Sequence, residues 1–232
     1  MDPAETELEQ ARTAILASDY LAAVQACRAA LGKCPKHVEA TTLLAESYRE
    51  MGLLDAAEDL LRRVLSADPE SVLAHWSLGL LLSDQEQEQE AVARLSCARE
   101  LTPANPEILA DLQHMVVDRR SAAKPTRAML GRIYLAQGLY QWAAEEFRAV
   151  LAANPRRLDV WVAFVQSLWL AGEVEEAAGA CEAILAEAPD CLQALLILAR
   201  VRRQEGDQVA AEQLLARAQE MDPAGTVAAR LQ

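Results

Sequence analysis

The sequence is poor in aromatic residues. They make up 4% of its 232 residues, within a hydrophobic fraction of 52% in which alanine and leucine dominate. Both of these residues lose little rotamer freedom in a helix. No stretch of alternating β-branched residues predicts a strand. The composition therefore favours closely packed helices.

Basic charge is also scarce. Basic residues cluster no further than pairs such as Arg62–Arg63, and the formal net charge is −13. A nucleic-acid-binding surface needs cations that neutralise phosphates, and an anionic membrane would repel this chain. We therefore expect neither partner. Residues 1–123 carry 21 acidic and 11 basic side chains, which is consistent with an acidic solvated face or with a basic partner for that half.

Features of secretion and of disulfide scaffolds are missing as well. The five cysteines (Cys27, Cys34, Cys97, Cys181 and Cys191) form no CxxC motif, so we interpret them as small buried hydrophobic residues in a reducing compartment. The acidic N-terminus lacks the basic and apolar regions of a secretion signal. No apolar run approaches the roughly 20 residues that span a bilayer. The expected location is cytoplasmic.

No catalytic or metal-binding pattern is present. His37, His75 and His114 have no acidic or cysteine partner at the spacing of metal ligands, and we expect all three to be solvated surface residues. Phosphate-binding glycine motifs, nucleophile elbows and zinc-protease motifs are absent from the sequence. We therefore predict no enzyme, no cofactor and no metal.

Prolines recur at a fixed spacing. Within each of two groups, successive prolines lie 34 residues apart: Pro35, Pro69 and Pro103, then Pro155, Pro189 and Pro223. Each follows a stretch with helical character, and a proline there cannot continue the helix. The spacing indicates six copies of one structural unit.

Smaller residues recur inside each copy. A glycine, which can end a helix in the left-handed conformation, lies 17 residues before four of the prolines. An alanine lies 12 residues before all six, where its size lets two helices approach closely. The glycines are Gly52, Gly138, Gly172 and Gly206, and the alanines are Ala23, Ala57, Ala91, Ala143, Ala177 and Ala211. Each copy is therefore predicted to be an antiparallel pair of helices.

This pattern resembles the tetratricopeptide repeat. The clearest copy runs Leu130, Gly131, Tyr134, Gly138, Ala143 and Phe147 ahead of Pro155. Other copies depart from the pattern: Ser18 and Glu86 stand in the place of the turn glycine, and Arg202 in the place of the tyrosine. The resemblance covers nearly the whole chain and implies an all-α solenoid of six helix hairpins.

The repeat is interrupted once. Pro103 and Pro155 lie 52 residues apart, which leaves 18 more than one period. The extra segment Pro106–Arg120 is predicted to form one amphipathic helix. We expect two domains, residues 1–120 with three repeats and this capping or linking helix, and residues 124–232 with three repeats. One continuous solenoid with a bulge is the alternative.

The family resemblance also implies a binding surface. In tetratricopeptide proteins the first helix of each repeat lines a concave groove that receives a peptide or helix of another protein. The groove residues implied here are Leu43, Leu73, Trp76, Leu80, Met129, Arg132, Val162, Gln166, Trp169, Leu196, Arg200 and Arg203. The two tryptophans are either anchors for a ligand or fillers between neighbouring helices. The Lys/Asn/Arg clamp with which some members hold a C-terminal carboxylate is not matched.

These observations predict an interaction scaffold that binds a segment of a partner protein in an apolar groove. The alternatives are a docking or regulatory arm of a larger enzyme and an oligomerisation module. The nine residues after Pro223 are too few for the helix that normally covers the last hairpin. We therefore expect Val209, Leu214, Leu215 and Ala218 to be exposed and available for self-association.

Overall fold

The chain is all-α, as the sequence predicts. A computed structural model describes residues 3–115 and 125–231, and within these ranges it contains helices and no strands. The helices are α1 (Glu5–Leu16), α2 (Tyr20–Lys33), α3 (Val38–Glu50), α4 (Leu54–Ala67), α5 (Val72–Asp84), α6 (Glu88–Leu101), α7 (Pro106–Met115), α9 (Arg127–Ala136), α10 (Tyr140–Ala153), α11 (Leu158–Ala171), α12 (Val174–Glu187), α13 (Leu192–Gln204), α14 (Gln208–Met221) and α15 (Thr226–Arg230).

The helices pair into the six predicted hairpins, α1 with α2 through α13 with α14. The four predicted turn glycines all adopt positive φ, between 75° and 88°. In the first and third hairpins the same turns are made by Ser18 and Glu86, at φ 57° and 61°. After each second helix comes one capping residue, and that residue is directly followed by one of the six recurring prolines. The period in the sequence therefore corresponds to one hairpin.

Small residues bring the two helices of a hairpin together. All six recurring alanines are completely buried. In the fourth hairpin, a Cβ built on Gly131 would lie 2.6 Å from Cε1 of Phe147, and one on Gly79 in the third would lie 2.8 Å from Cγ of Leu95. A side chain at either glycine would therefore displace the Phe147 ring or the Leu95 side chain that packs against it. The motif positions that carry the family resemblance are thus contact points in the core.

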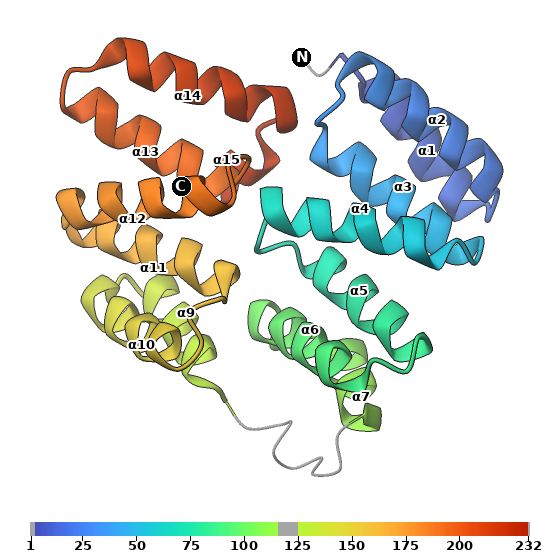
Figure 1. Cartoon of the computed structure of the whole chain (residues 1–232), viewed down its shortest axis with the longest axis horizontal. Helices are drawn as coiled ribbons and strands as arrows, with labels where there is room; N and C mark the ends of the chain where they lie inside the picture. The colour runs from blue at the N-terminus through green and yellow to red at the C-terminus, as the bar shows by residue number, and fades with distance from the viewer. Residues whose placement is uncertain (1–2, 116–124, 232) are drawn as a thin grey trace.

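Two arrays of hairpins lie side by side and run in opposite directions (Figure 1). We call α1–α7 the first array and α9–α15 the second array. Within each array, first helices touch the first helices of neighbouring hairpins, as α11 does with α9 and α13. Second helices make no comparable contacts with one another within the described ranges. We call the side of the first helices the inner face.

The loops that connect successive hairpins meet where the arrays face each other, and we call this contact the seam. Arg157, which precedes α11, donates to Glu100 of α6 at 2.5 Å and to Asp159 at 2.6 Å. Gln193 of α13 donates to Asp68, the residue after α4, at 2.8 Å. The seam is therefore held by polar contacts between loop residues and helix ends far apart in the sequence.

The boundary between the predicted domains lies largely outside the described residues. The expected helix Pro106–Arg120 is observed as α7 up to Met115, and its predicted last turn is in the part that the structure does not describe. A division at residues 120 and 124 therefore stays a prediction.

The predicted exposure of the C-terminal end is wrong in most of its detail. The residues after Pro223 form the short helix α15, which packs on α13 and buries Val227 and Leu231. Ala218 is buried, and Leu214 and Leu215 are half-buried against the core. Of the four residues named, only Val209 is largely exposed, at 68%.

Two histidines correct the expectation of solvated surface residues. His37 is buried and accepts from the Ala40 amide at the start of α3, and His75 is buried with Nε2 2.9 Å from the Pro69 carbonyl. Both therefore stabilise backbone at the starts of helices. His114 is exposed, as expected.

The cysteines follow the prediction more closely. All five are free; four are buried and Cys34 is half-buried. Burial raises the pKa of Cys27, Cys97, Cys181 and Cys191 to about 12, so these thiols remain protonated at neutral pH.

Candidate binding groove

A cavity of about 550 Å³ opens on the inner face of the second array, and we call it the inner cleft. Its side walls come from three parts of the chain: α9 to α11 of the second array, the start of α5 and end of α6 in the first array, and the C-terminal segment. The lining residues are Glu70, Val72, Leu101, Arg132, Leu135, Ala136, Tyr140, Gln166, Leu170, Arg230 and Leu231. One groove is therefore built from both arrays.

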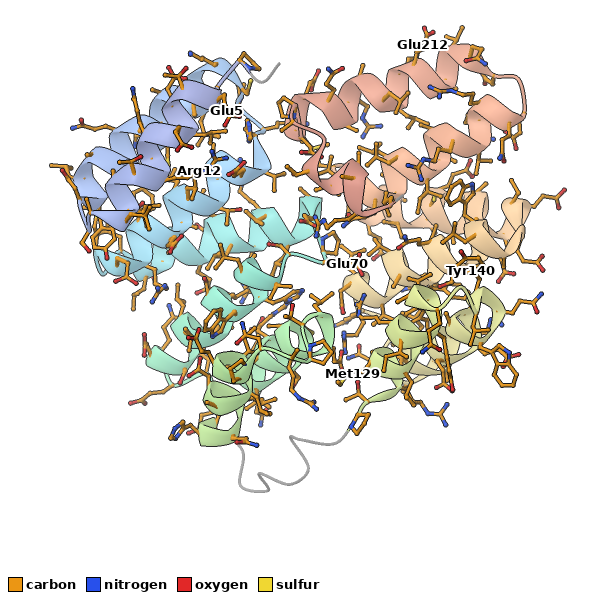
Figure 2. The ribbon with its side chains drawn as sticks, turned by 180° about the vertical axis from the view of Figure 1, so that it is seen from behind. Glu5, Arg12, Glu70, Met129, Tyr140 and Glu212 are labelled. Carbon is orange, nitrogen blue, oxygen red and sulfur yellow. The ribbon has the colours of Figure 1, made fainter. Side chains whose placement is uncertain are left out.

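Arg132 ties the inner cleft to the seam. Its guanidinium donates to the Glu70 carboxylate and, at 3.3 Å, to Asp159. Figure 2 places Glu70 between the two arrays. Burial alone would raise the pKa of Asp159. The hydrogen bond and positive charge of Arg157, together with the charge of Arg132, outweigh burial and hold the pKa of Asp159 below its usual range. Asp159 is thus a buried carboxylate that orients two arginines.

Two polar side chains of the inner cleft are free to bond a ligand. The side chain of Gln166 makes no hydrogen bond within the described residues, nor does the hydroxyl of Tyr140. Leu135, Ala136 and Leu170 supply apolar wall beside them. An extended peptide presents both backbone amides and apolar side chains, so this mixture suits such a ligand.

The C-terminal segment forms one edge of the cleft. Arg200 donates to the Leu231 carbonyl at 3.0 Å, and its guanidinium lies 4.9 Å from the ring centroid of Trp169. Arg230 pairs with Asp68 of the first array. This segment therefore links the inner face of the second array to the seam.

The structure brings together only some of the predicted groove residues. Arg132 and Gln166 line the inner cleft, and Arg203 is exposed on the same row of first helices. Met129, Val162 and Leu196 are buried within the second array and offer little surface to a ligand. In the first array, Leu43, Trp76 and Leu80 are half-buried, whereas Leu73 is 40% exposed.

Both predicted tryptophan anchors have contacts within the protein. Trp76 donates its indole N–H to Asp111 of α7 at 2.8 Å. Trp169 packs against the core of the second array beneath Arg200. Each tryptophan ring is therefore partly engaged in packing within the protein, which is the second of the two roles that the sequence predicted.

Several lining residues were missed at the sequence level. Leu135 and Leu170 lie one helical turn from Arg132 and Gln166 on the same helices, so the repeat period could have identified them. Glu70, Val72 and Leu101 belong to the other array. No local pattern shows that residues so distant in sequence share a cavity.

Comparison with known proteins agrees with the architecture. Models described as tetratricopeptide repeat match residues 14–79, 128–190 and 162–226. These stretches together cover well over half of the chain. The chain belongs to the tetratricopeptide repeat family. No curated protein matches it.

Solved structures that resemble the chain include MamA, with 16% identity, a TM-score of 0.44, and coverage of 97% of this chain and 94% of that one. Another is YrrB, described as a tetratricopeptide protein with an unusual peptide-binding site, with 15% identity, a TM-score of 0.40, and coverage of 89% and 97%. A mutant O-GlcNAc transferase from Thermobaculum terrenum is 27% identical over 63% of this chain, with a TM-score of 0.47, and the match spans 26% of that enzyme.

Within residues 3–115 and 125–231, no helix has the combined length and apolarity needed to cross a membrane. The same residues contain no group of three or more histidine, cysteine or acidic side chains arranged to hold a metal ion.

Proposed function

We propose that this protein is a non-enzymatic interaction scaffold that binds a short segment of a partner protein in the inner cleft. The observation that carries the proposal is a cavity of about 550 Å³ with apolar wall and unpaired polar groups on the inner face. Leu135, Ala136 and Leu170 would contact an apolar side chain of the ligand, while Gln166 would bond its backbone. The predicted cytoplasmic location belongs to this proposal.

Filling the cleft without removing core packing tests this function. Ala136 is exposed at the end of α9 and lines the cleft, so Ala136→Trp should obstruct it while leaving the fold intact. Ala216, an exposed alanine on α14, provides the matched control Ala216→Trp. We expect the first substitution to weaken partner binding at least about tenfold, equivalent to about 1.4 kcal/mol, and the second to leave it unchanged.

The partner for this measurement is the protein retained by the wild-type chain from a cell extract, afterwards purified and titrated. Melting temperatures of both variants establish that each is folded. Wild-type affinity in a folded Ala136→Trp protein would exclude the inner cleft as the site.

Self-association is a second candidate. Leu16, Leu21 and Val209 are 87%, 61% and 68% exposed; Leu16 and Leu21 flank the turn of the first hairpin, and Val209 follows the turn of the last. Exposed apolar side chains of this kind favour protein contacts. Analytical ultracentrifugation of the wild type and of Leu16→Ser with Leu21→Ser distinguishes this candidate, because self-association through the first hairpin would be lost in the double variant.

A further inference from the structure

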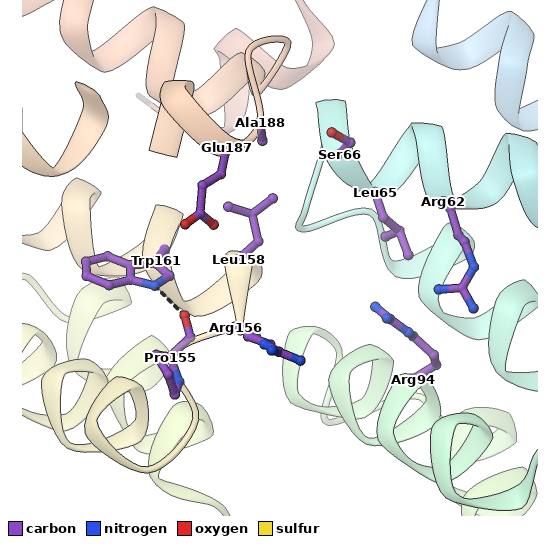
Figure 3. A pocket seen from close by; sticks show the side chains of 10 residues that line it. All are labelled: Arg62, Leu65, Ser66, Arg94, Pro155, Arg156, Leu158, Trp161, Glu187 and Ala188. Carbon is purple, nitrogen blue, oxygen red and sulfur yellow. Dashed lines mark hydrogen bonds between the residues drawn. The ribbon is translucent and has the colours of Figure 1, made fainter. Parts of the chain in front are cut away.

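A second cleft crosses the seam among the second helices, and its lining is rich in arginine. We call this cavity, of about 340 Å³, the outer cleft (Figure 3). Its lining residues are Arg62, Leu65, Ser66, Arg94, Pro155, Arg156, Leu158, Trp161, Glu187 and Ala188. Three arginines thus converge on one space in a chain whose net charge is −13.

The arginines come from both arrays. Arg62 of α4 and Arg94 of α6 both donate to the same oxygen of Glu90, at 3.0 and 3.1 Å. Arg156 belongs to the loop between α10 and α11 and extends into the same cleft (Figure 3). The two guanidinium groups share one carboxylate, so the charge of Glu90 offsets only one of them.

The donors of this cluster are incompletely satisfied. Arg62 is paired with both Glu58 and Glu90. Arg94 uses one nitrogen for Glu90, and its buried Nε has no partner within the described residues. The guanidinium of Arg156 makes no hydrogen bond or ion pair there. Arg94 and Arg156 therefore face the cleft from opposite arrays with free donors.

An adjoining chamber of about 300 Å³ shares Leu65, Arg94, Arg156 and Leu158 with the outer cleft. His75 lines this chamber and is 3% exposed, and its Nδ1 has no partner within the described ranges. A buried polar atom without a partner is costly in a finished core. Because Nε2 faces the Pro69 carbonyl and carries the ring proton, Nδ1 is an acceptor that could bond a donor group of a ligand but not its oxyanion.

The walls restrict the kind of anion. Leu65, Pro155 and Leu158 are apolar, and Trp161 is held by a 2.8 Å hydrogen bond from its indole to the Pro155 carbonyl. Among the lining residues of the outer cleft, Glu187 is the one acidic side chain. A bare ion would leave these apolar walls without contacts, whereas an anionic group on an organic body would cover them.

We propose that the outer cleft binds a phosphate-class oxyanion on an organic group, which bridges Arg94 of the first array and Arg156 of the second. Guanidinium groups bond phosphate oxygens in pairs with matching geometry, and phosphate offers enough oxygens for both arginines at once. Such a ligand would join the two arrays, so its binding stabilises their contact. This site is separate from the inner cleft and does not depend on it.

Calorimetric titration of the whole chain tests the site with three probes: inorganic phosphate, phenyl phosphate and a phosphoserine peptide. Ionic strength is held constant in each titration, and sodium chloride is titrated as the control salt. Inorganic phosphate measures the free ion, while the other two distinguish a small organic phosphate from a phosphorylated protein segment. We expect phenyl phosphate or the peptide to bind more tightly than the free ion, because of the apolar walls.

The decisive variant is Arg156→Ala, which removes an exposed side chain with no internal partner and should leave the fold unchanged. Arg127→Ala is the matched control, since Arg127 is exposed, carries the same charge and lies outside the outer cleft. We expect Arg156→Ala to weaken phosphate binding at least tenfold and Arg127→Ala to leave it unchanged.

A second variant, Arg94→Lys, keeps the charge beside Glu90 but loses the planar donor pair, and should weaken binding as well. Equal affinity of wild type and Arg156→Ala would overturn the proposal. The proposal is also overturned if none of the three probes binds, or if sodium chloride at the same ionic strength gives the same heat as the probes.

Discussion

Two turns of this protein adopt left-handed backbone without glycine. Ser18 and Glu86 have φ of 57° and 61°, where the equivalent turns use Gly52, Gly138 and Gly172. A residue with a Cβ is about 1–2 kcal/mol less stable in this conformation than in the right-handed one. The repeat period in the sequence predicts both positions, since each occupies the place of a turn glycine.

Replacing Glu86 by glycine should therefore stabilise the protein. Relief of the left-handed strain is partly offset by about 0.5–1 kcal/mol of backbone entropy that glycine loses on folding. The expected net gain in the free energy of unfolding is about 0.5–1 kcal/mol, measured by chemical denaturation. Glu88→Gly, at the start of α6, is the control and should destabilise. A loss of stability in Glu86→Gly would contradict the strain argument.

At the scale of elements, α7 is held by a hydrogen bond from α5 in addition to its packing on α6. The indole of Trp76 on α5 reaches Asp111 of α7, and Ile108 and Leu112 are buried on the same helix. The amphipathic pattern of this segment could be predicted because its period is local. The role of Trp76 could not, because its partner lies 35 residues away and its spacing fits a groove equally well.

Trp76→Phe should loosen α7 while preserving most of the buried ring. The lost hydrogen bond has a charged acceptor and is partly buried, so we expect a destabilisation of about 1–2 kcal/mol. Faster hydrogen exchange should appear in α7 before α5. The matched control is Trp142→Phe, since Trp142 is 61% exposed and makes no hydrogen bond within the described residues. Equal exchange of α7 in both variants would mean that the contact does not hold this helix.

At the scale of the whole molecule, the arrangement of the arrays determines which surfaces are available. The six hairpins and their order follow from the 34-residue period, because each hairpin's core is formed by contacts within one or two repeats. The seam has no such signature. Arg157 with Glu100, Gln193 with Asp68 and Arg132 with Glu70 pair across 57, 125 and 62 residues, and nothing local marks them as partners.

This long-range closure also explains why the inner cleft contains only some of the predicted groove residues. The family pattern places Arg132 and Gln166 on the inner face, and they do line the inner cleft. The family pattern assigns the whole groove to a single row of first helices. Here the first array and the C-terminal segment supply the facing wall, through residues such as Val72 and Leu231.

If a partner segment occupies the inner cleft, site-specific photo-crosslinking should capture it there. A photoreactive amino acid replaces Gln166 inside the cleft in one protein and the exposed Gln213 on α14 in another. With the purified partner, we expect a covalent adduct from position 166 and none from position 213. An adduct from position 213 alone would place the partner on α14, outside the inner cleft, and contradict the proposed binding site.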